Sequence, residues 1–226
     1  ERTFEAALLK AIRSLEIGLH HLYVSDFTEL SIKDIKKKLS LVDDKRIFLI
    51  AEAIRRGIEI KDIAKITFVD IFFLEKIKNI IRMERKLAKS LDNNKLIEAK
   101  KMGFSDKAIA QYTGKKQESI RAMRKKINLV PSYKIVDTCA AEYDAKTSYY
   151  YSTYGREDEV QPTNNKKVLV LGSGPIRIGQ GVEFDYCSVH SVWALREMGI
   201  ETIIINNNPE TVSTDFDTSD RLYFEP

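Results

Sequence analysis

Residues 168–181 read Val-Leu-Val-Leu-Gly-Ser-Gly-Pro-Ile-Arg-Ile-Gly-Gln-Gly, and this stretch decides the fold of the chain around it. The four apolar residues predict a buried strand, and the glycines that follow predict a turn that opens a helix. Backbone amides in such a turn can approach an anion closely because no side chain intervenes. The stretch therefore predicts an α/β domain with a candidate binding loop after its first strand.

The residues that follow this loop continue the α/β pattern. A helix is predicted near 180–198, and apolar strands are predicted at 201–206 and 221–224. Each of the strands at 167–171 and 201–206 contains a continuous apolar run, which is typical of a parallel sheet covered on both faces. Three strands are too few for a normal parallel sheet. We therefore predict an incomplete α/β domain with a Rossmann-like parallel sheet, and expect a piece of a longer protein.

The first part of the chain is predicted to be mainly α-helical. Apolar residues recur there at helical spacing, with polar residues between them. Ser31, Asp70 and Ser105 are candidate N-caps, because their side chains can accept hydrogen bonds from free amides of a first helical turn. The predicted helices span residues 4–19, 31–39, 46–56, 70–91, 95–102, 105–113 and 117–127.

The predicted domain boundaries follow changes in composition. Residues 1–154 form the helical domain and end in an extended, tyrosine-rich arm, because tyrosines favour extended structure. Residues 155–166 are polar and charged and contain Pro162, which is typical of a linker. Residues 167–226 form the partial α/β domain.

Charge is distributed unevenly along the chain. Residues 1–126 contain 29 Lys plus Arg and 18 Asp plus Glu, a balance of +11, whereas residues 127–226 contain 8 and 15, a balance of −7. A basic half is compatible with nucleic-acid binding. Lysines that coat the solvent faces of ordinary helices give the same count.

Residues 105–127 permit an alternative functional hypothesis, a basic helix-turn-helix module that binds DNA. Two short predicted helices flank Gly114, and the second would offer Gln117, Arg121 and Arg124 to a groove. However, Lys115 follows the turn glycine at a position that is usually apolar. A helical hairpin inside a larger domain explains the same pattern, and we do not expect nucleic acid to be a partner.

The glycine loop matches a dinucleotide site poorly. That fingerprint needs a glycine three residues after its second glycine, and Arg177 occupies this position. Asn206 and the two asparagines after it stand where an acidic residue would bind a ribose hydroxyl. A weaker third hypothesis, a nicotinamide-dependent dehydrogenase, is therefore disfavoured.

Together with the residues on both sides, the glycine loop indicates one protein family much more specifically than the glycines alone do. The run from Gly172 to Tyr186 and the run Asn-Pro-Glu-Thr-Val-Ser-Thr-Asp at 208–215 resemble the pre-ATP-grasp domain of the carbamoyl phosphate synthase large subunit, where its second half begins. Upstream, Arg-Ser-Leu-Glu at 13–16, Val-Asp-Thr-Cys-Ala-Ala-Glu at 136–142 and Tyr-Ser-Thr-Tyr at 151–154 are similar to that subunit's oligomerisation domain and exit arm. The resemblance covers essentially the whole chain.

The resemblance implies an ATP-dependent ligase that makes carbamoyl phosphate from bicarbonate, ammonia or glutamine, and two ATP. This segment would support subunit assembly and begin the carbamate-phosphorylating half. By matching positions, Gly181, Glu183 and Glu210 would line the passage that delivers carbamate. Glu183 as a first-turn helix residue and Glu210 as a turn residue remain structural alternatives.

The same resemblance implies which cofactors bind outside the segment and which proteins are its partners. ATP and Mg²⁺ (or Mn²⁺) would bind outside it, so we expect no cofactor, metal or catalytic residue here and an inactive fragment. The implied partners are a glutaminase small subunit and further copies, through the helical domain.

Two further features concern the compartment. Cys139 and Cys187 show no metal-ligand spacing and are expected to be reduced thiols. No apolar run approaches the roughly 18 residues that span a bilayer. We expect a cytoplasmic protein without a membrane partner.

Overall fold

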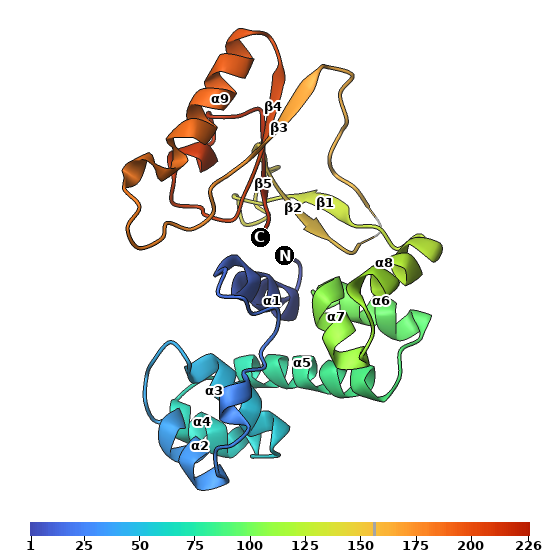
Figure 1. Ribbon diagram of the computed structural model, residues 1–226, viewed down its shortest axis with the longest axis vertical. Helices are drawn as coiled ribbons and strands as arrows, with labels where there is room; N and C mark the ends of the chain where they lie inside the picture. Colours follow the sequence, from blue (N-terminus) through green and yellow to red (C-terminus); the bar gives the residue numbers. More distant parts are fainter. Residues whose placement is uncertain (156) are drawn as a thin grey trace. The chain divides into compact units, whose positions relative to one another are not determined.

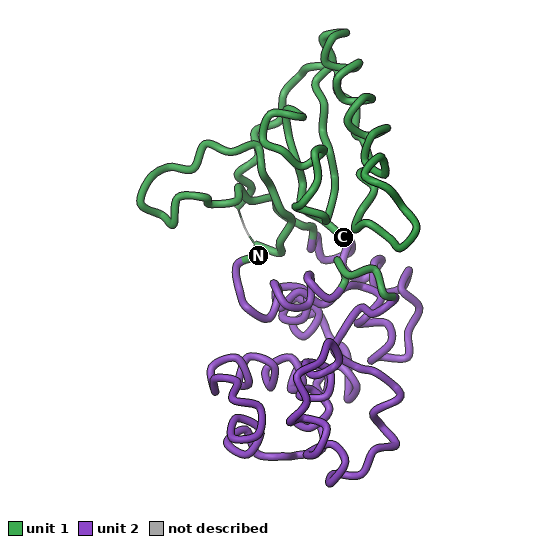
Figure 2. Tube along the Cα trace, turned by 90° about the vertical axis from the view of Figure 1, so that its left-hand side faces the viewer, with its two compact units in different colours: residues 1, 13–17, 130–226 green, residues 2–12, 18–129 purple. Residues whose placement is uncertain are grey.

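The computed structural model describes residues 1–155 and 157–226, and these form two compact units (Figure 2). The α/β unit comprises residues 1, 13–17 and 130–226, and the helical unit comprises residues 2–12 and 18–129. Helices and a mostly parallel sheet are both present, which confirms the predicted fold class. The predicted linker, 155–166, includes position 156, which lies outside the described residues, and the predicted domain boundaries stay a prediction.

Amphipathic helices occupy the first 129 residues (Figure 1). They are α1 (Phe4–Ser14), α2 (Ile32–Leu39), α3 (Arg46–Arg55), α4 (Ile60–Thr67), α5 (Ile71–Lys89), α6 (Asn93–Lys101), α7 (Asp106–Thr113) and α8 (Gln117–Lys126), with a short 3-10 helix, η1 (Ser25–Phe27). Their apolar faces form one core that includes Leu9, Leu74, Ile80 and Phe104. Within the part of the chain that the structure describes, no helix is long and apolar enough to cross a membrane.

The three predicted N-caps are confirmed. The side chain of Ser31 accepts a hydrogen bond from the amide of Asp34, that of Asp70 from Phe72, and that of Ser105 from Ala108. Each cap satisfies an amide that has no partner inside its own helix.

The first helix ends earlier than its apolar spacing predicts. It stops at Ser14 and not near residue 19, because Glu16 (φ 53°) and Gly18 (φ 80°) adopt left-handed backbone conformations. The carbonyl of Ser14 accepts a hydrogen bond from Asn207 Nδ2 (3.1 Å), so a bond to a distant side chain satisfies it at the helix end. Helix α4 was not predicted from the sequence, and Glu59, at its N-cap, makes no side-chain capping bond.

Helices α7 and α8 form the predicted pair around Gly114, which has φ 64°. Ile109 and Ile120 are fully buried and hold the pair in the core of the helical unit. Arg124 Nε and Nη2 both donate to Asp106 Oδ2 (3.2 and 3.1 Å). This arginine therefore links the two helices to each other.

The α/β unit contains a five-stranded sheet of order β1-β2-β5-β4-β3. The strands are β1 (Ser132–Ile135), β2 (Tyr149–Thr153), β3 (Lys167–Leu171), β4 (Glu201–Asn206) and β5 (Arg221–Phe224). β1 is antiparallel to β2, and the other neighbouring pairs are parallel. The predicted extended arm thus forms two strands of this sheet, because β2 pairs with β5.

Helix α9 (Tyr186–Glu197) packs on one face of the sheet, against β3 and β4 (Figure 1). Val192 and Ile204 meet in a small core there, and Val170 packs beside them. Leu169 and Leu171 belong to the opposite face and are 51% and 72% exposed, so the described residues do not cover both faces as predicted. A short 3-10 helix, η2 (Val182–Asp185), precedes α9, which starts six residues later than predicted.

Candidate functional site

The glycine loop lies at the carboxyl edge of the parallel strands. Strand β3 ends at Leu171, and the amide of Gly172 donates to the carbonyl of Ile205 in β4 (2.8 Å). The loop after β4 comprises residues 207–220. Because parallel strands end at one edge of the sheet, this loop and the glycine loop at 172–181 start side by side. Ligands of open α/β sheets bind at this edge, which makes these two loops the candidate site.

Asn206, the last residue of β4, fixes the glycine loop through hydrogen bonds of its side chain. Asn206 is 2% exposed, and its Oδ1 accepts from the amides of Gly174 and Asn208, both at 3.2 Å. Its Nδ2 donates to Ser213 Oγ (3.1 Å). A Cβ at Gly172 would lie 2.5 Å from Asn206 Cγ, so only glycine permits this approach of strand and side chain.

Asp185 ties the same loops together from the side of η2. It is 3% exposed, and its Oδ1 accepts from Ser173 Oγ (3.0 Å). Its Oδ2 accepts from Thr211 Oγ1 and from the amide of Ser213, both at 2.7 Å. The motifs did not predict Asp185 as a site residue, although an acidic residue directly before the helix that follows a glycine loop can indicate one.

The loop amides that the sequence predicts to face an anion are partly engaged within the protein. The amide of Gly172 donates to Ile205, that of Gly174 to Asn206, and that of Arg177 to Gln180 Oε1 (2.8 Å). Hydrogen bonds therefore hold the loop in place at these three positions, and these three amides are not available to bind an anion.

The three predicted passage residues lie in or next to these two loops. Glu210 lines a pocket of about 430 Å³ with Pro175, Val182, Phe184 and other residues of the two loops. Glu183 is exposed, and its carboxylate lies against Gly181, where an added Cβ would be 2.1 Å from Oε2. Of the three, only Glu210 is among the residues that line this pocket, and the passage role stays a prediction for all three.

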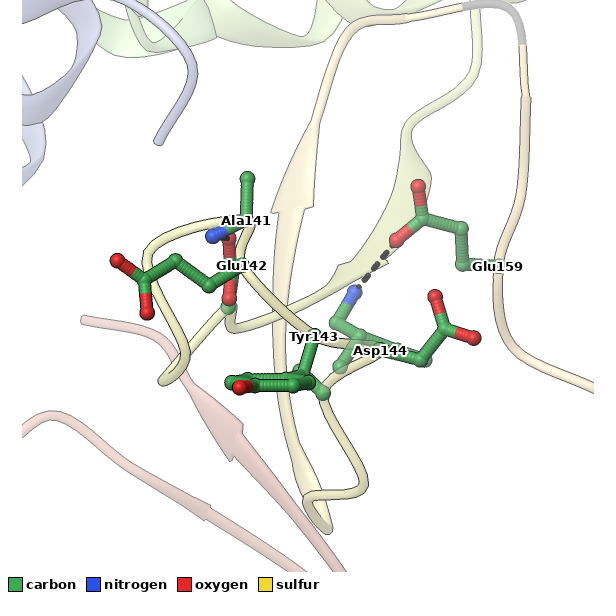
Figure 3. A pocket seen from close by; sticks show the side chains of 8 residues that line it. Ala141, Glu142, Tyr143, Asp144 and Glu159 are labelled. Carbon is green, nitrogen blue, oxygen red and sulfur yellow. Dashed lines mark hydrogen bonds between the residues drawn. The ribbon is translucent and has the colours of Figure 1, made fainter.

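A second pocket lies beside β1, at the loop that follows it (Figure 3). It measures about 800 Å³ and is lined by four acidic residues. They are Asp137, Glu142, Asp144 and Glu159. The buried Lys134 donates from Nζ to Glu159 Oε1 (2.7 Å), and Asp137 accepts from the amides of Cys139 and Ala141. Two of the four acids therefore serve the structure of the loop.

Metal ligation has no support in the residues that the structure describes. They contain no group of three His, Cys, Asp or Glu side chains that could hold an ion. Both cysteines are free thiols.

These observations define the class: a helical domain joined to an α/β domain with a glycine loop at its sheet edge. A family model for the carbamoyl-phosphate synthetase large chain oligomerisation domain matches residues 1–128. A model for the carbamoyl phosphate synthase preATP-grasp domain matches residues 164–226. The chain belongs to the carbamoyl phosphate synthase large-chain family.

Similar proteins support this assignment over the full length of the chain. It is 58% identical over 227 residues to the carbamoyl phosphate synthase large chain of Thermoanaerobacter pseudethanolicus, and the match covers 100% of this chain and 21% of that relative. It is 54% identical over 225 residues to the large chain of Methanothrix thermoacetophila, again across 21% of the relative. The chain thus spans about a fifth of the length of these relatives.

Proposed function

We propose that this chain is part of an ATP-dependent ligase that makes carbamoyl phosphate from bicarbonate, ammonia or glutamine, and two ATP. The observation that supports this most directly is the 58% identity across the entire chain to a carbamoyl phosphate synthase large chain. Both family models agree with it, one on the helical residues and one on the glycine-loop residues.

Within that enzyme, the helical unit supports assembly of subunits and the α/β unit begins the carbamate-phosphorylating half. Gly181, Glu183 and Glu210 line the passage for carbamate. The position of Glu210 in the lining of a pocket between the two site loops supports this role. Carboxylates at a passage can orient a reactive solute through hydrogen bonds and help to exclude bulk water.

The proposed partners are a glutaminase small subunit and further copies of the same chain, in the cytoplasm. In the proposed enzyme, ATP and Mg²⁺ or Mn²⁺ bind outside this segment. We therefore expect the 226-residue chain alone to hydrolyse no ATP, which a phosphate-release assay with and without bicarbonate would check.

The proposed function is tested in a chimaera. The matching segment of the Thermoanaerobacter pseudethanolicus large chain is replaced by this chain, and carbamoyl phosphate is measured with ammonia as nitrogen donor. The chimaera should retain synthesis. Glu210→Ala should reduce synthesis by about tenfold or more while bicarbonate-dependent ATP hydrolysis continues, because the two chemical steps are then uncoupled.

Glu197→Ala is the matched control, because Glu197 is an exposed acid of the same unit outside both loops. A folded chimaera that makes no carbamoyl phosphate would contradict the proposed function. Equal synthesis by the Glu210→Ala and Glu197→Ala chimaeras would contradict the passage role.

A further inference from the structure

A short segment from the start of the chain belongs to the α/β unit. Residues 13–17 group with residues 130–226, whereas residues 2–12 and 18–129 form the helical unit. Glu16 lies in this segment with φ 53°, a left-handed conformation that costs a non-glycine residue free energy. Such a conformation persists only where other contacts hold it.

Glu16 contacts the glycine loop at one point and the loop after β4 at another. Its Oε2 accepts from Arg177 Nη2 (2.9 Å), and its Oε1 accepts from Asn207 Nδ2 (3.3 Å). The same Nδ2 donates to the carbonyl of Ser14 (3.1 Å). One carboxylate therefore joins Arg177 of the first site loop to Asn207 of the second.

The carboxylate is also close to the loop backbone. A Cβ added at Gly174 would lie 2.8 Å from Glu16 Oε1. Gly174 is buried, has φ 72°, and donates its amide to Asn206, the residue that fixes the loop from the other side. The loop is thus held between a buried asparagine and the carboxylate of Glu16.

We propose that Glu16 is a positioning residue that fixes the glycine loop, 172–181, against the loop after β4. Its consequence for catalysis rests on the proposed function, but its effect on the loop does not. The side chains of Glu16 and Arg177 are 34% and 69% exposed, and exposed ion pairs add little to global stability. Glu16 therefore acts on the position of the loop and not on the stability of the fold.

Hydrogen exchange of the 226-residue chain tests the proposal. The amides of Gly174, Arg177 and Gln180 belong to the glycine loop and are hydrogen-bonded, the first to Asn206 of β4, so their exchange reports opening of this loop. Glu16→Gln should raise their exchange rates about twofold to fivefold, the range expected for one partly exposed ion pair. Exchange elsewhere and the midpoint of thermal unfolding should not change.

Arg177→Gln removes the same contact from the loop side and keeps the proposal testable if Glu16→Gln fails to fold. The double variant should add little to either single variant, because the two residues act as a pair. Glu197→Gln is the control and should leave exchange unchanged. Unchanged loop exchange in both single variants would overturn the proposal, as would a rise spread over all peptides.

A second arm uses the full-length chimaera. Glu16→Gln should lower the kcat of carbamoyl phosphate synthesis and leave the KM for bicarbonate unchanged. A displaced glycine loop would affect the passage of carbamate and not the binding of bicarbonate in the first step. An unchanged kcat, in a chimaera whose loop exchange has risen, would overturn the catalytic consequence. An inactive parent chimaera would count against the proposed function, and hydrogen exchange would still decide the role of Glu16.

Discussion

At the scale of single residues, His21 is a buried imidazole whose neighbours select its neutral form. It is 6% exposed, its Nδ1 accepts from the amide of Tyr23 (3.1 Å), and its Nε2 lies 2.8 Å from Gln111 Oε1. Since Nδ1 is an acceptor, Nε2 carries the proton and donates to Gln111. Burial lowers the pKa of His21, and the bond to Gln111 opposes this only in part.

Stability should therefore fall on mild acidification. The pKa of histidine in an unfolded chain is about 6.5, so below that pH the unfolded state binds a proton that folded His21 does not. The free energy of unfolding should decrease as pH falls from about 6.5 toward the folded pKa of His21. His21→Gln should flatten this slope in urea unfolding at pH 7.5 and 5.5. His20 and His190 are present in both proteins, so equal slopes would contradict the prediction.

Two glycines of the site loop should respond differently to alanine. At Gly172 the new Cβ would meet the side chain of Asn206, which is buried and hydrogen-bonded. At Gly181 it would meet the carboxylate of Glu183, the free end of an exposed side chain that can move away. Gly172→Ala should cost about 1–3 kcal/mol of unfolding free energy as an overpacking change, and Gly181→Ala much less.

Chemical unfolding of both glycine variants, followed by tryptophan fluorescence, gives the measurement, because Trp193 lies on α9 of the same unit. Equal losses in the two variants would show that the rigidity of Asn206 does not decide the cost.

At the scale of elements, a buried ion cluster joins α3 to α5. Arg55 Nε and Nη2 donate to the two carboxylate oxygens of Glu84 (2.8 and 3.1 Å), and Nη1 donates to Glu52 (3.2 Å). Burial opposes the charge of Arg55, but the contacts with Glu84 outweigh it and leave the pKa of Arg55 raised. Burial, and then the nearby Glu84, raise the pKa of the Tyr112 phenol.

Glu84→Ala should destabilise the helical unit by about 3–5 kcal/mol, because it leaves the Arg55 charge buried with less compensation. Glu98→Ala is the control, since the Lys86–Glu98 pair is about half exposed and should contribute less than about 1 kcal/mol. Urea unfolding followed by circular dichroism at 222 nm measures both. A similar small loss in both variants would contradict the view that burial sets the cost.

Sequence patterns predicted the elements whose causes are local. The caps at Ser31, Asp70 and Ser105 act within three residues, so spacing alone reveals them. Helix α4 was not predicted because neither of its ends carries a typical signal. Glu59 makes no capping bond at the start of the helix, and the helix ends at the left-handed Phe68 and not at a glycine. The position of Glu16 could not be predicted, because its partner Arg177 lies 161 residues away.

The site shows the same division. The glycine loop and the asparagines after β4 were visible as motifs, and the resemblance placed Gly181, Glu183 and Glu210 near them. The role of Asp185 depends on partners 12, 26 and 28 residues away, whose approach only the folded sheet brings about. Long-range pairing also decides that β2 joins β5, through Tyr149 and Tyr150.

At the scale of the whole molecule, the uneven charge bears on the DNA-binding alternative. Residues 1–126 have a balance of +11, so the chain should attract any polyanion at low salt. Base readout needs free side chains on the second helix of the pair. Arg124, one of the two arginines that α8 would offer, instead binds Asp106 and the carbonyl of Leu129 (3.0 Å).

Nucleic acid is not an expected partner, so any binding of DNA at low salt should be electrostatic and without sequence preference. Fluorescence anisotropy with two unrelated duplexes should give the same affinity at each salt concentration, and the logarithm of that affinity should fall with a slope of about 0.9 per phosphate contacted. Arg121→Ala, which removes an exposed cation of α8, should weaken both complexes equally. A preference of more than about tenfold for one duplex, lost in Arg121→Ala, would mean base readout by α8 and would revive the helix-turn-helix hypothesis.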